Sequence, residues 1–499
     1  MKIYRAKQIR QLDQYTISNE PIASIDLMER ASKAFVNYFV VDFPNVKNVN
    51  IICGTGNNGG DGLAIARLLQ EKNYEVNVFV LQYTKNFSED FTANLERLKV
   101  HPVHIHEIEN IEQLQKINLQ GLIIDAILGS GLNQPLKGLL KAVVDHLNTL
   151  AIPIVSVDIP TGVFADDATK GSAIHADKVY SFQYPKLAFM LPENARFINS
   201  WQVLDIGLLK QGEAEMHTSF EYLTRDAIHF IYRDRGKFSH KGTYGHLLLI
   251  AGSKGKAGAA ILAAKAALRS GIGLLSLFVP DDILPILQEA VPEAMCLTIS
   301  PEALCKEFQI SKTYSALAIG PGIGTSKPAT DLAANIIDHY PSPMIIDADC
   351  LNILAQNRSL LQKLPELSIL TPHPGEFRRL VGEWGNDFER LSLQQELAKQ
   401  YNIIVVLKGA HTSIAHPNGQ VAFNSTGNNG MATAGSGDTL TGIIAGLLTQ
   451  GYASFEAAKL GVYLHGLAGD LALHEEHPNS LIASDITAHL GQAFKAIDV

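Results

Sequence analysis

Short apolar runs alternate with longer amphipathic stretches along most of the chain. In the first half, helical stretches separate apolar runs of strand length at residues 49–53, 75–81, 121–128 and 152–158. The alternation restarts in the second half, with strand-length runs at residues 245–250, 316–320, 343–348, 367–370 and 403–407. Strands that alternate with helices form parallel sheets covered by helices on both faces. The pattern therefore predicts two α/β regions, with ligands expected at the carboxyl ends of their strands.

A polar stretch without clear periodicity, residues 208–224, separates the two series of strands. We place the domain boundary inside this stretch, and we assign residues 1–212 to one domain and residues 213–499 to the other. The glycine-rich motifs of the two halves differ, so the pattern does not indicate an internal duplication.

Composition narrows the class of protein without identifying it. Of the 499 residues, 46% are hydrophobic and 18% are charged, which is ordinary for a soluble globular protein, and the formal net charge is −9. No cluster of Lys and Arg indicates a nucleic-acid partner. The longest apolar region, residues 257–279, contains Lys265 and Arg269, which argues against a membrane span. Cys53, Cys296, Cys305 and Cys350 show neither a disulfide framework nor a CxxC motif, so we expect a reduced, cytoplasmic setting. We also expect a homo-oligomer.

The most informative stretch is the loop of small residues from Asn428 to Asp438, which leads directly into the apolar run 439–448. Small residues let backbone N–H groups converge on an anion, and a helix N-terminus adds positive potential. Asp438 places one carboxylate beside this anion site. A phosphate cradle with a single base is suited to phosphoryl transfer from a nucleotide to a hydroxyl. A helix start capped by Asp438 is the alternative interpretation of this motif alone.

Other strands of the second half are followed by residues suited to a charged ligand. Small residues at 252–260 and 320–324 allow a ligand to approach the backbone closely. Charged or polar side chains follow three further strands, namely Asp347, Asp349, His373, Glu376 and Lys408. Each also has a structural alternative. The aspartates could form turn hydrogen bonds, the histidine could lie in a rigid turn between prolines, and the glutamate could cap a helix.

The first half contains a second glycine-rich turn, residues 54–62, between a strand and a helix. This is the general arrangement for phosphate contact. Asn57, Asn58 and Asp61 occupy positions at which the redox fingerprint Gly-x-Gly-x-x-Gly has mostly small residues, so hydride transfer is poorly supported. Cys53 precedes this turn without a neighbouring His, which favours a buried small residue over a nucleophile.

Oxygen-bearing side chains follow three strands of the first half. Asn58, Asp125 and Thr161 supply only oxygen ligands, which hard cations prefer, and no Cys/His set indicates zinc. Asp158 is a candidate acid or base facing the ligand. Capping of a turn is the alternative for either aspartate taken singly. Strand ends converge in space, so the three loops taken together favour a site.

Three of these segments, residues 54–62, 125–132 and 158–162, resemble the epimerase domain of the NAD(P)H-hydrate repair enzymes. The substrate of that domain is a reduced nicotinamide cofactor with a hydroxyl added at C6, and the domain interconverts its R and S epimers. The resemblance implies that Asp158 contacts the reacting nicotinamide and that Asn58, Asp125 and Thr161 hold K⁺. From the oxygen ligands alone, sodium, calcium or magnesium fits equally well. Contacts to the hydrate are implied for Asn57, Asn58, Gly59, Gly60, Asp61, Gly129, Ser130, Gly131, Leu132, Asn133, Gln134, Pro135 and Asp158.

Residues 241–246, 373–376 and 430–438 resemble the dehydratase domain of the same enzymes, so the resemblance covers essentially the whole chain. It implies a Rossmann-like doubly wound sheet followed by a ribokinase-like α/β domain that uses Mg²⁺ with ADP or ATP. Contacts to the hydrated cofactor are implied for Ala257, Gly322, His373 and Asp438. Contacts to the nucleotide are implied for Lys408, Gly409, Ala410, His411, Thr412, Ala434, Gly435, Ser436 and Gly437.

The resulting hypothesis is bifunctional repair of hydrated NADH and NADPH. Asp438 would activate the C6 hydroxyl for attack on the terminal phosphate, and loss of phosphate would restore the cofactor. Three alternatives remain open from the sequence. The first is a ribokinase-like kinase for a vitamin precursor or sugar, fused to a nucleotide-binding module. The second makes the first half a non-catalytic sensing or interaction module, and the third is a NAD-dependent dehydrogenase.

Overall fold

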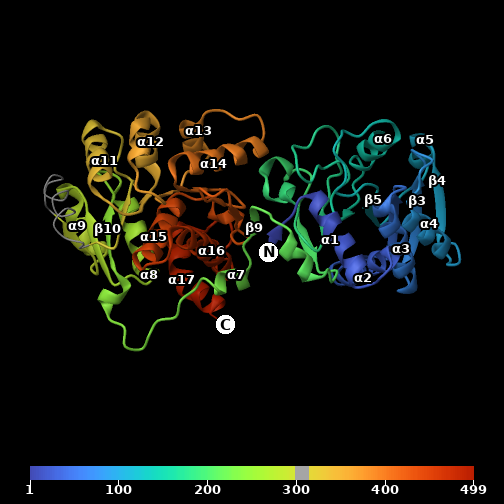
Figure 1. Cartoon of the computed structure of the whole chain (residues 1–499), viewed down its shortest axis with the longest axis horizontal. Coiled ribbons are helices and arrows are strands. Elements are labelled where there is room, and N and C mark those ends of the chain that lie inside the picture. Colours follow the sequence, from blue (N-terminus) through green and yellow to red (C-terminus); the bar gives the residue numbers. More distant parts are fainter. Residues whose placement is uncertain (298–313, 499) are drawn as a thin grey trace. The chain divides into compact units, whose positions relative to one another are not determined.

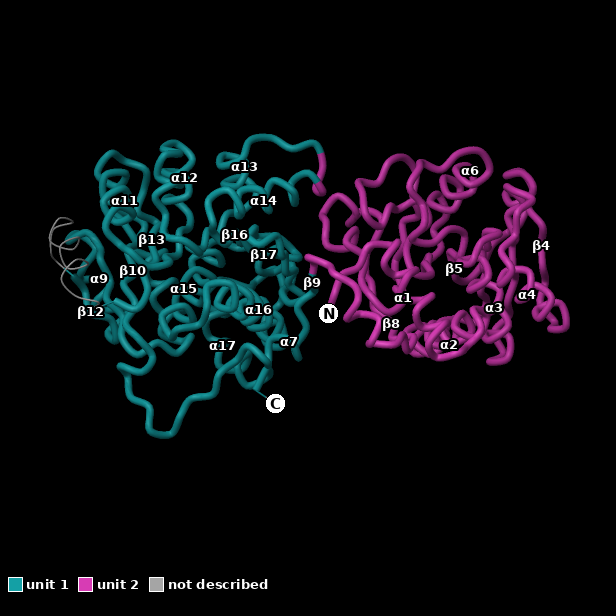
Figure 2. The backbone as a smooth tube through the Cα atoms, viewed as in Figure 1, with its two compact units in different colours: residues 1, 221–385, 389–499 teal, residues 2–220, 386–388 magenta. Residues whose placement is uncertain are grey.

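The computed structural model describes residues 1–297 and 314–498, which form two compact units (Figure 2). The N-terminal unit, drawn in magenta, comprises residues 2–220 and 386–388, and the C-terminal unit, drawn in teal, comprises residue 1 and residues 221–385 and 389–499. The main junction therefore falls after residue 220, within the polar stretch 208–224. Cys305 lies outside the described residues.

The N-terminal unit is built on a fully parallel sheet with the strand order β4-β3-β2-β5-β6-β7-β8. The chain moves outward in one direction from β2 to β4 and then in the other from β5 to β8, as in a doubly wound sheet. The neighbours β2 and β5 form the switch point. The strands are β2 (Asn48–Cys53), β3 (Glu75–Leu81), β4 (His104–Ile108), β5 (Leu122–Ala126), β6 (Ile154–Val157), β7 (Lys178–Phe182) and β8 (Trp201–Leu204).

Helices cover both faces of this sheet (Figure 1). On one face α2, α3 and α4 pack against one another, and α5 and α6 pack together on the other. Every residue of β5 is buried, as is typical of a parallel strand covered on both faces. The helices are α1 (Ala6–Asn19), α2 (Ser24–Asp42), α3 (Asn57–Glu71), α4 (Glu89–Leu98), α5 (Ile111–Gln115) and α6 (Gly138–Leu147).

Cys53, the last residue of β2, is fully buried in the core of this unit. A Cβ on Gly62 of α3 would lie 2.8 Å from its Sγ, so helix and strand meet closely at this point. Burial and the nearby Asp125 raise the pKa of the Cys53 thiol. The sequence-based interpretation of Cys53 as a small core residue is confirmed.

The C-terminal unit has a mixed sheet with the order β18-β17-β16-β15-β14-β13-β10-β11-β12. Strands from β12 to β16 pair in parallel, whereas β17 pairs antiparallel with both β16 and β18. The strands are β10 (His246–Ile250), β11 (Leu274–Phe278), β12 (Met295–Leu297), β13 (Ala316–Ile319), β14 (Met344–Ile346), β15 (Ile369–Leu370), β16 (Ile404–Leu407), β17 (Ser413–Ala415) and β18 (Val421–Phe423). Two further strands are β1 (Lys2–Ile3) and β9 (Phe220–Tyr222).

Helices α8, α15, α16 and α17 pack against one another around a core of Ala, Leu and Ile side chains. None of the described helices is both long and apolar enough to cross a membrane. The helices are α7 (Arg225–His229), α8 (Ala257–Arg269), α9 (Leu284–Ala290), α11 (Lys327–His339), α12 (Ala348–Gln356), α13 (Pro374–Val381), α14 (Asp387–Tyr401), α15 (Ser436–Thr449), α16 (Ser454–Ala472) and α17 (Ala483–Ile497).

The contact between α15 and α8 depends on small residues. A Cβ on Gly442 of α15 would lie 2.1 Å from the carbonyl oxygen of Ala263 in α8, which is closer than any real contact. On the next turn, a Cβ on Gly446 would lie 2.8 Å from the Cβ of Ser270. These glycines let the two backbones approach, and the approach fixes the start of α15, where Asp438 lies.

We expect Gly442→Ala to lower the melting temperature, because the added methyl group forces the two helices apart at a cost of about 1–3 kcal/mol or more. The matched control is Gly491→Ala in α17, where a Cβ would meet nothing within 4 Å. That change should leave the melting temperature unchanged or raise it, because alanine favours a helix. Calorimetric melting curves of both variants test the prediction, and equal curves would contradict it.

Two candidate active sites

A cavity of about 710 Å³ opens at the carboxyl ends of β2, β5 and β6 in the N-terminal unit. Residues of α1 and α2 form part of its wall. The structure brings several predicted site residues together there, namely Asn57, Asn58, Asp61, Gly129, Ser130, Gly131, Leu132 and Asp158. Asn133, Gln134 and Pro135 are exposed and do not line this cavity, and Gly59 and Gly60 are buried inside α3.

Asp125 and Thr161 form a buried cluster behind this cavity. Thr161 donates to Asp125 twice, from Oγ1 to Oδ1 at 2.6 Å and from its backbone N–H to Oδ2 at 2.8 Å. Ser156 Oγ donates to Oδ2 at 2.8 Å, and the Ile127 N–H donates to Oδ1 at 3.3 Å. Burial raises the pKa of Asp125, and these hydrogen bonds counteract part of that rise.

This cluster has the chemistry of a cation site. In the described part of the chain, no Lys, Arg or His hydrogen bonds or ion-pairs with Asp125, so every donor to this buried carboxylate is neutral. The amide nitrogen of Asn58 is buried without a hydrogen-bond partner. The Asn58 side chain lies beside the loop after β5, since a Cβ on Gly129 would lie 3.5 Å from Asn58 Oδ1. A buried carboxylate needs a positive partner, and these oxygen atoms suit a hard cation.

Asp158 follows β6 and has a positive φ of 66°, which is rare for a residue other than glycine. Its Oδ1 accepts hydrogen bonds from Lys186 Nζ at 2.6 Å and from the Phe182 N–H at 3.1 Å. Lys186 is only 1% exposed, and its Nζ also donates to Ser181 Oγ at 2.9 Å and to the Tyr184 carbonyl at 3.2 Å. Asp158 is therefore a fixed charge at the cavity wall.

Other carboxyl groups share this cavity with Asp158. Asp13 lies on α1, and burial together with the nearby Asp158 raises its pKa to about 7. Burial, Asp158, Asp13 and Asp90 raise the pKa of Asp61 well above its usual value. Near neutral pH the Asp13 carboxyl group therefore carries a proton in part of the molecules. Such groups are able to exchange protons with a ligand.

The C-terminal unit has a second cavity of about 710 Å³. The predicted residues that line it are His373, Lys408, Gly409, Ala410, Thr412, Gly435, Ser436, Gly437 and Asp438. Asp347 and Glu376 line it as well. Ala434 and His411 do not, and His411 Nδ1 instead lies 2.9 Å from the Asn424 carbonyl oxygen.

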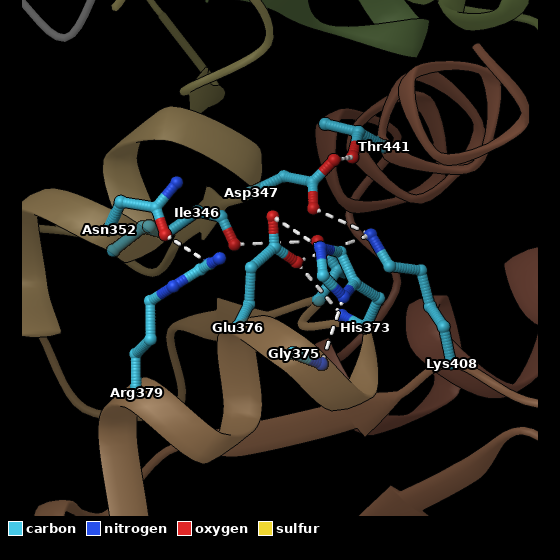
Figure 3. A network of polar contacts seen from close by, with 10 residues as sticks. Ile346, Asp347, Asn352, His373, Gly375, Glu376, Arg379, Lys408 and Thr441 are labelled. Carbon is cyan, nitrogen blue, oxygen red and sulfur yellow. Dashed lines mark hydrogen bonds and ion pairs between the residues drawn. The ribbon is translucent and has the colours of Figure 1, made fainter. Parts of the chain in front are cut away.

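Lys408, Asp347 and Glu376 form a network of charges in this cavity (Figure 3). Lys408 Nζ lies 3.0 Å from Asp347 Oδ1 and 4.0 Å from Glu376 Oε2. Thr441 of α15 donates to Asp347 Oδ2 at 2.7 Å. Burial alone would lower the pKa of Lys408. The negative charges of Asp347 and Glu376 have the larger effect, so the pKa of this lysine is raised. A Cβ on Gly437 would lie 3.2 Å from Lys408 Nζ, so the ammonium group is held beside the small-residue loop.

His373 both caps a helix and faces the cavity (Figure 3). Its Nδ1 accepts a hydrogen bond from the Gly375 N–H at 3.0 Å, and Glu376 Oε2 accepts one from the His373 N–H at 2.9 Å. The structure thus confirms that His373 and Glu376 take part in capping the helix. The His373 side chain is nevertheless 52% exposed, so it remains accessible to a ligand. Partial burial, Lys408 and Arg379 lower the pKa of His373, which favours the neutral imidazole.

Asp438 is the third residue of α15, directly after Gly435, which has a φ of 86°. Burial and the nearby Asp347 raise the pKa of Asp438 to about 6, although Lys408 lowers it. Among the described residues, no side chain donates a hydrogen bond to its carboxylate. Asp438 is therefore mostly ionised at neutral pH and free to accept a proton.

Ala257 and Gly322 lie together, outside the residues that line this cavity. A Cβ on Gly322 would lie 3.1 Å from the carbonyl oxygen of Lys256, next to Ala257 at the start of α8. Lys256 Nζ pairs with Asp349 Oδ2 at 3.0 Å, and the Gly324 N–H donates to the same oxygen at 2.8 Å. Lys256 is thus a surface lysine with a defined partner.

Comparison with known proteins identifies the family. The family described as NAD(P)H-hydrate dehydratase matches residues 247–491, and the family described as YjeF-related protein N-terminus matches residues 24–188. A bifunctional NAD(P)H-hydrate repair enzyme from Moorella thermoacetica is 36% identical over 516 aligned residues, covering 100% of this chain and 97% of the relative. The chain belongs to the family of bifunctional NAD(P)H-hydrate repair enzymes.

Two solved structures resemble just over half of the chain. An ADP/ATP-dependent NAD(P)H-hydrate dehydratase from Bacillus subtilis, co-crystallised with ATP and Mg²⁺, is 34% identical with a TM-score of 0.50, and it covers 56% of this chain and 98% of its own. A ribokinase-like superfamily protein from Enterococcus faecalis is 28% identical with a TM-score of 0.50 and the same coverage. They confirm the predicted ribokinase-like fold.

Among the residues that sequence reasoning missed at the two sites of this member of the repair enzyme family are Lys186, Asp13 and His465. Lys186 pairs with Asp158, and Asp13 lines the first cavity from α1. His465 lines the second cavity, with Nε2 3.0 Å from the Ser436 carbonyl oxygen. The one available signal was at Lys186, a lone lysine in the otherwise apolar run 184–191.

Proposed function

We propose that this chain repairs hydrated NADH and NADPH in two reactions. The N-terminal unit interconverts the R and S epimers of the hydrate, and the C-terminal unit dehydrates the S epimer at the expense of ADP or ATP. Beyond the family itself, the observation that carries the proposal is Asp438. Its pKa is about 6, no described side chain donates a hydrogen bond to it, and it lies in a cavity that also holds Lys408 and the small-residue loop.

The dehydration must remove hydroxide from C6, and hydroxide is a poor leaving group. Asp438 accepts the proton of the C6 hydroxyl as that oxygen attacks the terminal phosphorus of the nucleotide. The bond from that phosphorus to AMP (from ADP) or ADP (from ATP) breaks, and C6 now carries a phosphate ester. The ring nitrogen then donates its electron pair, the C6–O bond breaks, and loss of a ring proton restores NAD(P)H and releases phosphate.

Lys408 and the loop 434–437 stabilise the charge that develops on the phosphate. Lys408 is held beside Gly437 by Asp347, so it needs no rearrangement when the nucleotide binds. The carboxylates of Asp347 and Glu376 line the same cavity and are suitable oxygen ligands for Mg²⁺. When bound, Mg²⁺ offsets phosphate charge.

In the N-terminal cavity, Asp158 is the residue we assign to the reacting nicotinamide. Lys186 holds it as a carboxylate at the cavity wall. Inversion at C6 requires one bond to this carbon to break and to form again, and these steps need groups that can take up and release protons. Asp13, with a pKa of about 7, supplies a group that can take up or release a proton near neutral pH, and the pKa of Asp61 is also raised. We also expect Asn57, Gly129 and neighbouring residues to contact the hydrate.

We propose that Asn58, Asp125 and Thr161 hold K⁺ beside this cavity. The support is the buried carboxylate of Asp125, whose donors in the described part of the chain are all neutral. A monovalent cation offsets one negative charge without adding excess positive charge. A cytoplasmic location and self-association stay predictions from the sequence.

Restoration of NADH is the expected outcome when the protein is mixed with ADP, Mg²⁺, K⁺ and an R/S mixture of hydrated NADH. Full recovery of the NADH absorbance requires both activities, whereas dehydration alone recovers only the S fraction. Choline in place of K⁺ is the control for the cation site. ATP is used in a parallel reaction.

No recovery of NADH with either nucleotide would contradict the proposal. A small-molecule kinase would instead release a stable phosphoester from a vitamin precursor or sugar, without inorganic phosphate. Measurement of phosphate release therefore separates the two functions.

The two units should lose activity independently. Asp438→Asn removes the base, so we expect a loss of dehydration of at least about 100-fold with epimer exchange intact. Asp158→Ala should abolish epimer exchange and leave dehydration of the S epimer unchanged. Chromatographic separation of the epimers measures both reactions. Full dehydration by Asp438→Asn would show that another residue is the base.

Dehydration should depend on the ionisation of Asp438. Its pKa is raised to about 6, so the base is ionised above that pH. We expect kcat/KM for dehydration to fall about tenfold per pH unit below it. Asp347→Asn removes a negative charge that raises this pKa, so the inflection should move to lower pH. The range from about pH 5 to 7 covers roughly one unit on either side of this pKa. A kcat/KM that stays constant over this range would contradict the assignment.

A further inference from the structure

The cavity of the N-terminal unit is strongly acidic. Asp13, Asp61, Asp90 and Asp158 all line it, and Arg10 is the one Lys or Arg among the described residues that line it. A hydrated dinucleotide carries a diphosphate with two negative charges. Ionised carboxylates repel such a group, and Arg10 is the one Lys or Arg of the described lining that could bind it.

Arg10 lies on α1 and reaches across the cavity wall to the loop after β5. A Cβ on Gly131 would lie 2.0 Å from Arg10 Nη2 and 3.2 Å from Cζ, so the guanidinium rests against the bare backbone of this glycine. Gly131 belongs to the loop for which contact with the hydrate is implied. The absence of a side chain at this position is what makes room for Arg10.

The charge of Arg10 is not committed to another residue by a direct contact. Within the described ranges, its guanidinium makes no hydrogen bond and no ion pair. Asp13, one turn further along α1, interacts with it over a longer distance, and this interaction partly lowers the pKa of Asp13. Because burial and Asp158 nevertheless raise that pKa to about 7, Asp13 competes only in part for the guanidinium near neutral pH.

The start of α3 faces the same cavity. Gly56 precedes this helix of 15 residues, and Gly56, Asn57 and Asn58 all line the cavity wall. Backbone N–H groups at a helix start favour an anion, and α3 has no acidic residue in its first turn.

We propose that Arg10 binds the diphosphate of the hydrated dinucleotide in the epimerase cavity. This assignment rests on the proposed function of the N-terminal unit and deepens it. It also gives α1 a role in substrate recognition, although this helix precedes residues 24–188, which match the family of the N-terminal unit. A guanidinium matches phosphate oxygens with two parallel N–H groups, so arginine suits this contact better than lysine.

The first test is calorimetric titration of the full chain with NADH, which carries the diphosphate and is not consumed. Affinity for the site in the N-terminal unit should fall roughly tenfold in Arg10→Ala, as expected for loss of a hydrogen bond to a charged group. Arg10→Lys should give an intermediate value. Lys7 and Arg10 are both exposed residues of α1, but only Arg10 lines the cavity, so Lys7→Ala should leave the affinity unchanged. Equal affinities of wild type and Arg10→Ala, or no NADH binding by either, would overturn the assignment.

The second test is the rate of epimer exchange. With hydrated NADH, Arg10→Ala should raise KM roughly tenfold with kcat unchanged, because a contact remote from C6 contributes equally to the ground and transition states. With hydrated dihydronicotinamide riboside, which has no phosphate, wild type and Arg10→Ala should not differ. Dehydration by the same variant should be unchanged, which shows that the chain is folded.

Hydrated NADPH separates the two possible phosphate partners. An effect of Arg10→Ala seen with hydrated NADPH but absent with hydrated NADH would assign Arg10 to the 2′-phosphate and overturn the diphosphate contact. Failure of the proposed function looks different, because wild type would then show no epimer exchange with any substrate. The titration with NADH still decides the role of Arg10 in that case.

Discussion

Parallel pairing of strands is the constraint on which both sites depend. In a parallel sheet all carboxyl ends lie at one edge, so residues far apart in sequence meet wherever their strands are neighbours. Asp347, His373 and Lys408 follow β14, β15 and β16, which are consecutive in the sheet. The same rule places Asp125 and Asp158 at the ends of the neighbours β5 and β6. The order of the strands in each sheet thus brings the site residues together.

Two buried carboxylates at these sheet edges differ in their partners, because one forms an ion pair and the other receives hydrogen bonds from neutral groups. Asp347 pairs with Lys408, which turns a buried negative charge into a means of holding a positive charge beside the small-residue loop. Asp125 receives hydrogen bonds from neutral donors only, within the described residues, so its negative charge remains. The first arrangement suits an anionic ligand and the second suits a cation. The difference fits a phosphate site in one unit and a K⁺ site in the other.

The sequence predicted strands correctly where a continuous apolar run marks the strand. The apolar run 75–81 is strand β3 over its whole length, and the other predicted runs contain β2, β5, β6, β10 and β13 to β16, apart from one residue at the start of β2. Glycine-rich loops after those strands then located residues that line both cavities. In contrast, Asn133 to Pro135 were assigned by resemblance, and the structure places them on the surface.

The sequence did not predict contacts made by helices and strands that lie far along the chain from any recognised motif. Arg10 and Asp13 lie on α1, ahead of the first predicted strand, and only tertiary packing brings that helix over the carboxyl ends. β17 and β18 are three residues each, too short for a period-two pattern to be recognised. His465 lies in the interior of α16, where a buried histidine is indistinguishable from an ordinary core residue.

The two carboxylates that we propose as catalytic show how the environment of an aspartate, rather than its residue type, determines what it can do. Asp158 is fixed by Lys186, whereas Asp438 receives no hydrogen bond from a described side chain and has a raised pKa of about 6. A base with a pKa somewhat below neutral is ionised under physiological conditions and still binds a proton more strongly than an ordinary aspartate. Lys408 contributes to this balance, because it limits the rise caused by burial and Asp347. In the proposed mechanism, the same lysine positions the phosphate and limits the pKa of the base, so one charge acts on both nucleotide binding and proton removal.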